Sequence, residues 1–338
     1  MSTYVLIIFF KILNMKTKLN IEISSLKHIL TALVLLVSFY GNAQLKGGHI
    51  LGEMGLQSGT QSPANTLAVY VPGYWYAAST LRNSNGDVSV ANPDVNMFVT
   101  GVGISWVSDF KILGANYGAT ALLGFASNKI EGNNVNIDGS LALTDTYIVP
   151  VQLGWHKKRA DFVFSYQIYL PTGKYTAGAS DNSGLGMFMN EFSAGTTLFF
   201  NDKKTFHFST LASYEINGKK KDTDIKTGDI LSFEGGLGKT FYLFNAEKTA
   251  PKGIINAGLI YYLQYKVTND KIPVGGIVFE GDKDHVAALG AEVNFLHLKS
   301  KSTIGLRWLG EVDAVNRFQG NTFFLTLAHI FSTSTKKE

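Results

Sequence analysis

The sequence predicts an all-β fold: an antiparallel, up-and-down transmembrane β-barrel of about twelve strands, with an N-terminal segment that can plug the lumen. Three observations carry this prediction. Long extended runs repeat along the chain, their connections alternate between short and long, and each run has one apolar and one polar face. The 338-residue chain is also poor in charge, with 17% charged and 45% hydrophobic residues, whereas a soluble domain has about 25% charged residues.

The extended runs are the first observation. Several of them exceed the ~5–6 residues that are common in soluble sheets and reach the ~9–11 that a tilted strand needs to cross a bilayer. The runs lie near 66–80, 94–107, 111–127, 144–156, 160–171, 188–200, 205–216, 229–244, 253–268, 285–298, 302–311 and 318–331. The last run ends in Phe331, an aromatic residue of the kind that barrel assembly machinery favours there.

The connections are the second observation. Short polar turns at 108–111, 156–159, 201–204 and 298–301 alternate with longer segments such as 128–143, 171–187 and 268–284. Outer-membrane barrels have this rhythm, because their periplasmic turns are short and their extracellular loops are long. Two segments fit less well: 245–253 is long for a turn, and 311–317 is short for a loop.

The two faces of each run are the third observation. In residues 161–170, Phe162 and Phe164 fall on one face of an extended chain, and Ser165 and Gln167 fall on the other. A barrel in a membrane turns the aromatic face to lipid and the polar face to the lumen. A soluble two-sheet sandwich, which would bury the aromatic face under a second layer, is the alternative fold.

The amino terminus indicates export. Residues 15–43 combine lysines, an apolar run over 29–40 and the small-residue ending Gly41-Asn42-Ala43, which is the layout of a cleaved signal peptide. We expect residues 1–14 to be a mis-assigned extension upstream of Met15; an uncleaved membrane anchor is the alternative. Export and a barrel together predict the outer membrane of a Gram-negative bacterium.

The mature chain is expected to divide into three parts. Residues 44–64 form an N-terminal segment or plug, residues 65–332 form the barrel, and residues 333–338 form a polar tail. If residues 44–64 enter the lumen, Met54 and Leu56 can touch a passing apolar ligand. A periplasmic tail is the alternative for this segment.

Composition argues against several function classes. The chain has no cysteine, and its net charge of +4 is too small and too dispersed for a nucleic-acid partner. The histidines lack metal-ligand spacing, and residues 235–240 lack the full phosphate-loop frame. His207 and Ser209 share a face with Glu215, but any two polar residues two apart do so in a strand. We therefore expect no enzyme activity, no metal and no cofactor.

The inward polar positions are the candidate site. As a hypothesis they line a permeation path; the alternative is that they pair with one another, for example Arg307 with Glu292 on the neighbouring strand. The predicted lumen-lining residues are Gln152, Gln167, Glu191, Glu215, Glu234, Asn256, Gln264, Glu292, Asn294 and Arg307.

Two stretches carry a family resemblance. "GLQSG" at 55–59, followed by Pro63, and "YLPTGKY" at 169–175 resemble elements of the outer-membrane barrel family named for the meta-pathway of phenol degradation. The resemblance implies a transporter-like barrel, related to long-chain fatty-acid channels, that takes up small hydrophobic molecules. Its implied partners are outer-membrane lipids and lipopolysaccharide, a small hydrophobic solute and the barrel assembly machinery. A non-transporting structural or adhesive barrel that acts through its extracellular loops is the rival function.

Overall fold

The computed structural model describes residues 47–89, 94–132, 135–247, 249–274 and 277–333, which all belong to one compact unit. The predicted extension 1–14, the predicted signal peptide 15–43, residues 44–46 of the predicted N-terminal segment and residues 334–338 of the predicted tail lie outside the described residues. No helix within the described part of the chain is both long and apolar enough to cross a membrane.

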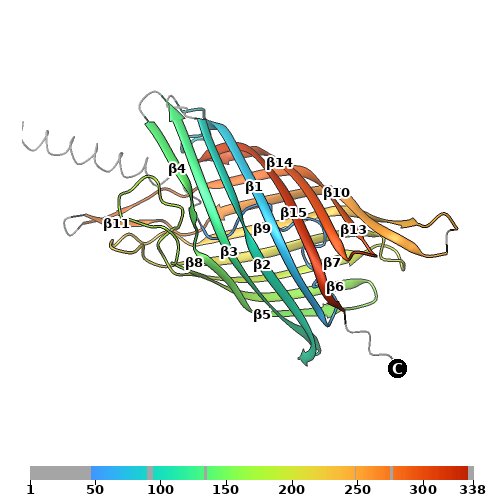
Figure 1. Ribbon diagram of the computed structural model, residues 1–338. Helices are drawn as coiled ribbons and strands as arrows, with labels where there is room; N and C mark the ends of the chain where they lie inside the picture. Colours follow the sequence, from blue (N-terminus) through green and yellow to red (C-terminus); the bar gives the residue numbers. More distant parts are fainter. Residues whose placement is uncertain (1–46, 90–93, 133–134, 248, 275–276, 334–338) are drawn as a thin grey trace, which may run out of the picture. The chain divides into compact units, whose positions relative to one another are not determined.

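Twelve long strands form the barrel (Figure 1). They are β1 (Thr66–Leu81), β2 (Asp94–Ile112), β3 (Ala115–Gly132), β5 (Thr146–His156), β6 (Ala160–Leu170), β7 (Met189–Phe199), β8 (Phe206–Asn217), β9 (Ile230–Phe244), β10 (Pro251–Lys266), β13 (His285–His297), β14 (Ser302–Val315) and β15 (Phe318–Thr333). Each pairs antiparallel with its neighbour along the chain, and β1 pairs with β15 from Thr66↔Thr333 to Leu81↔Phe318. The sheet is therefore closed, which leaves no edge strand with unpaired backbone groups.

Three further strands lie in segments that were expected to be loops. β4 (Val135–Leu143) pairs with β3 beyond the point where β3 pairs with β5. β11 (Lys271–Val274) and β12 (Ile277–Glu280) form a separate hairpin between β10 and β13. These hairpins extend from the same end of the barrel (Figure 1). The twelve predicted strands are confirmed, but the prediction of plain loops at these two places was wrong.

Two predicted connections also lie elsewhere. Residues 108–111 belong to β2, and the turn to β3 is Leu113-Gly114, with φ of 51° and 78°. Positive φ at both central residues matches the twist of the flanking strands. The expected loop 311–317 is mostly the end of β14, and only residues 316–317 separate β14 from β15. Alternation alone does not show where a strand stops, because polar residues continue the pattern beyond the membrane.

The side-chain faces agree with a barrel and exclude the soluble sandwich. On β6, Phe162 and Phe164 are 43% and 39% exposed, whereas Ser165 and Gln167 are 5% and 2% exposed. On β8, Phe206 is exposed and His207 is fully buried. In a single closed layer the buried face is the lumen, so the exposed apolar face has only lipid to meet.

Candidate functional site

The predicted lumen-lining residues come from β5 to β10, β13 and β14. Gln167, Glu191, Glu215, Glu234, Gln264 and Glu292 are buried, and Gln152, Asn256, Asn294 and Arg307 are half-buried. Residues of both sets form hydrogen bonds with other side chains inside the barrel. Asn256, for example, hydrogen-bonds His207 at 3.1 Å, and Gln264 accepts from Arg317 at 2.9 Å.

Three of the inward carboxylates bind the backbone of the N-terminal segment, residues 47–64. Glu215 on β8 accepts hydrogen bonds from the amides of residues 48 and 49, at 2.8 and 3.0 Å. Glu234 on β9 accepts from the amides of residues 52 and 54, at 2.7 and 2.8 Å. Glu292 on β13 accepts from the Leu56 amide at 2.7 Å. These are charge-assisted bonds, about twice as strong as neutral ones, and they hold the segment against the inner wall.

His49 is the polar side chain at the centre of this contact. Its Nδ1 lies 3.1 Å from Glu191 Oε1 and its Nε2 lies 3.2 Å from Glu234 Oε1, and it is 6% exposed. Burial by itself lowers the pKa of His49, but the charges of Glu191 and Glu234 outweigh it and raise the pKa well above its ordinary value. The docked segment therefore favours a protonated imidazole.

Arg307 connects the wall to the same segment. Its guanidinium lies 3.2 Å from Glu292 Oε1 on the neighbouring strand, which is the pairing that the sequence suggested as an alternative. It also donates to the carbonyl oxygens of Gly52, at 2.9 Å, and of Glu53. Arg307 therefore both knits the wall and binds the N-terminal segment.

Small residues let the segment lie this close. A Cβ added at Gly55 would lie 1.7 Å from Glu292 Oε2, and one at Gly59 would lie 2.1 Å from the backbone carbon of Thr196. Neither gap admits a methyl group. The Gly-rich composition of residues 47–59 was the sequence signal for this contact.

The two predicted plug residues take different positions. Leu56 is 8% exposed and belongs to an apolar cluster inside the barrel. Met54 is half-buried, and its amide binds Glu234. The other buried members of the cluster are Leu51, Tyr74, Val99, Ala126, Ile260, Tyr262, Val286, Ala288, Leu309, Ala314 and Phe324.

An inner cavity of about 70 Å³ lies between the N-terminal segment, the inner wall and the connection between β6 and β7. Its lining includes Ile50, Glu53, Tyr147, Tyr169, Leu185 and Met189. Burial raises the pKa of the Glu53 carboxyl, and the nearby charges of His49 and Glu234 act in opposite directions on it. Sequence reasoning did not single out His49 or Glu53, because no pattern links them to strands more than a hundred residues away.

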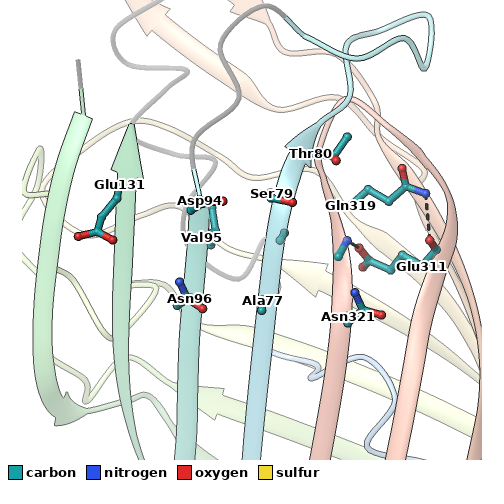
Figure 2. A pocket seen from close by; sticks show the side chains of 12 residues that line it. Ala77, Ser79, Thr80, Asp94, Val95, Asn96, Glu131, Glu311, Gln319 and Asn321 are labelled. Atoms are coloured by element: carbon teal, nitrogen blue, oxygen red, sulfur yellow. Dashed lines mark hydrogen bonds between the residues drawn. The ribbon is translucent and has the colours of Figure 1, made fainter. Parts of the chain in front are cut away.

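A second cavity, of about 470 Å³, lies among β1, β2, β3, β14 and β15 (Figure 2). Asn96, Ala77 and Asn321 lie at one level across β2, β1 and β15, in register with one another (Figure 2). One row nearer the short turns, Trp75 packs on its neighbours on β2 and β15, with ring centroids 5.0 and 5.7 Å apart. The exposed face thus changes from aromatic at the Trp75 row to polar at the row of Asn96 and Asn321, and this change marks the edge of the apolar belt.

His207 and Ser209, which share a face of β8 with Glu215, do not bond each other as a base and a nucleophile would. His207 Nε2 bonds Asn256, and the Ser209 hydroxyl donates to the Gly236 carbonyl at 3.5 Å. A base activates a nucleophile through a hydrogen bond, and in the described structure both side chains are bonded to other partners. The described ranges also contain no cluster of three or more His, Asp or Glu side chains that could hold a metal ion.

Comparison with solved structures gives the same architecture. The COG4313 outer membrane channel from Pseudomonas putida F1 superposes with a TM-score of 0.66 at 10% identity, covering 84% of this chain and 100% of that one. The β domain of the Bordetella autotransporter BrkA scores 0.45 at 12% identity, covering 79% and 100%, which is too low to carry an argument. No curated protein sequence matches the chain.

A family model supplies the assignment. It matches residues 78–327, which run from β1 to β15 and include most of the barrel. Together with the closed twelve-stranded barrel and its apolar outer face, this match shows an outer-membrane protein of a Gram-negative bacterium. The chain belongs to the family described as "Putative MetA-pathway of phenol degradation".

Proposed function

We propose that this protein is an outer-membrane channel for the passive uptake of small, largely hydrophobic molecules, including aromatic ones. The observation that carries the proposal is the apolar cluster inside the barrel, which joins Leu51 and Leu56 of the N-terminal segment to inward residues such as Tyr262 and Leu309. A lumen for sugars or ions would need polar groups along its whole path. An apolar solute gains free energy by leaving water for such a surface.

In this proposal residues 47–64 are the plug. The hydrogen bonds to Glu215, Glu234 and Glu292 hold it in place, and its release opens the path. Most of the inward polar residues then serve to dock the plug and knit the wall. The less buried amides of Gln152, Asn256 and Asn294 are the candidates for contact with a passing solute.

A flux assay tests the proposal. Liposomes that contain the purified protein are compared with empty liposomes for entry of toluene, followed by a trapped fluorescent reporter, and of arabinose, followed by swelling. We expect entry of toluene above the leak through lipid and little entry of arabinose. Equal absence of flux for both solutes would favour the rival function, a structural or adhesive barrel that acts through its long loops.

A further inference from the structure

The inner cavity lies between the N-terminal segment and the ends of β5 and β6 that lead into long connections. It is bounded by Ile50 and Glu53 of the N-terminal segment, and by Tyr147, Tyr169 and Leu185 from the long-loop end of the barrel. The two tyrosine rings pack with centroids 5.1 Å apart, and Tyr169 and Leu185 belong to a buried apolar cluster. The wall of the cavity is therefore mainly apolar.

The polar groups of the cavity wall are almost all used within the protein. The Tyr147 hydroxyl donates to Gln167, and the Tyr169 hydroxyl donates to Glu191 at 2.8 Å. Asp145 accepts from the backbone amides of residues 173 and 185, at 3.0 and 2.7 Å. The Ser183 hydroxyl donates to a backbone carbonyl at 2.7 Å. None of these groups needs a hydrogen bond from a ligand.

Glu53 differs from all of them. Within the described ranges its carboxyl group takes part in no hydrogen bond or ion pair, although the residue is half-buried and lines the cavity. A partly buried carboxyl group without a protein partner is incompletely solvated, which costs free energy. A ligand that donates a hydrogen bond to Glu53 removes this cost, whereas a ligand carboxylate adds a second negative charge next to it.

We propose that the inner cavity is a recognition site for the head group of an apolar molecule that carries one hydrogen-bond donor, either an ammonium group or a hydroxyl, with Glu53 as the acceptor. The proposal rests on the proposed uptake function and names its substrate class. The volume of about 70 Å³ fits such a head group and a few adjoining carbons. Ile50 and Val99 connect the cavity to the larger apolar cluster, which can take the body of the molecule.

Equilibrium binding tests this site directly. The purified mature protein in detergent is titrated calorimetrically with 2-phenylethylamine, 2-phenylethanol and phenylacetate, which share a ring and differ in the polar group. We expect the amine to bind at least about tenfold more tightly than phenylacetate, a difference of about 1.4 kcal/mol, with the alcohol between them. Equal binding of the three ligands, or tightest binding of phenylacetate, would overturn the proposal.

Two variants locate the effect. Glu53→Gln should remove the advantage of the amine over the alcohol. Glu131→Gln, in the second cavity of about 470 Å³, should leave it unchanged. Should Glu53→Gln not fold, Leu185→Phe, which fills the cavity, should weaken binding of all three ligands. An amine preference that survives Glu53→Gln, or binding that Leu185→Phe leaves unchanged, places the site elsewhere and refutes the assignment.

The binding assay and the flux assay can refute the two proposals separately. Toluene flux without any preference among head groups would refute this site and leave the channel standing. A clear preference among head groups without flux would refute the channel and leave the binding site.

Discussion

Three carboxylates that point into the lumen bind backbone amides of a segment far away in the chain. The Glu292 contact with the Leu56 amide joins residues 236 positions apart, and the Glu215 contact with the His49 amide joins residues 166 apart. Period-two alternation was enough to predict that these side chains face inward. It could not predict their partners, because nearly every residue has a backbone amide and the residue type does not show which amide a carboxylate will bind.

At the same scale, the charge of His49 makes docking of the segment depend on pH. The docked pKa is raised, so the His49 contribution is fully present below the pKa of a free imidazole, about 6.5, and is lost as the pH rises through the docked pKa. The groups that face His49 are Glu191, Glu215 and Glu234. Glu53 acts in the same direction, because its pKa is also raised and its ionisation with rising pH disfavours burial.

We therefore expect single-channel conductance to increase as the pH is raised from about 5 to about 9 across the imidazole range. His49→Gln, which cannot titrate, should raise the conductance at low pH and leave only the smaller pH dependence that Glu53 contributes. His297→Gln, whose ring contacts only the nearby Ser300 and Phe295 in the described structure, should keep the wild-type profile. Conductance that falls with rising pH would contradict the role given to His49.

At the scale of elements, the N-terminal segment and the barrel strands follow different rules. The strands β6 and β8 are specified by alternation, which repeats over 11 and 12 residues. Residues 47–64 have no such period, and the sequence left them open between a plug and a tail. Their position depends on glycines such as Gly55 and Gly59, whose importance appears only when the opposing wall is in place.

Removal of residues 44–60 should increase single-channel conductance several-fold, because the segment that lies in the lumen is lost. Gly59→Ala should give a smaller increase, since its methyl group would meet the backbone of Thr196 at 2.1 Å. Ser58→Ala, which loses only a weak hydrogen bond of 3.4 Å to the Glu234 carbonyl, is the matched control. An unchanged current after the deletion would exclude the plug.

The outward face of β6 gives an element-scale test of the membrane. Phe164 lies near the middle of the strand and is 39% exposed. Phe164→Arg should cost about 2–4 kcal/mol of folding free energy in lipid vesicles, whereas Val312→Arg, outward near the long-loop end of β14, should cost about 0–1 kcal/mol. Urea titration of the folded fraction measures both. Equal costs at the two depths would argue against a bilayer around this face.

At the scale of the whole molecule, closure of the sheet is the decisive feature. β1 pairs with β15 along its entire length, so every strand of the ring has two neighbours. Lipid offers no hydrogen-bond partner to a backbone amide, and a sheet with free edges could not cross it.

We expect the mature protein to fractionate with outer membranes, to need detergent for extraction and to migrate faster on a gel when it is not boiled. The boiled sample loses the closed barrel and runs at its full mass. The Phe164→Arg variant should yield less of the fast band. A processed chain that stays monodisperse in water without detergent would contradict the barrel.

The sequence by itself predicted an export signal, which stays a prediction. It correctly predicted the barrel, its twelve long strands and the inward orientation of residues such as Gln167 and Glu234. These features are local, because a strand repeats every two residues and a bilayer has a fixed thickness. Only the tertiary structure decided where residues 47–64 lie, that His49 sits between Glu191 and Glu234, and that Glu53 reaches a cavity beside Tyr147 and Tyr169. Those contacts join distant parts of the chain across the lumen, and their geometry exists only once the barrel has closed.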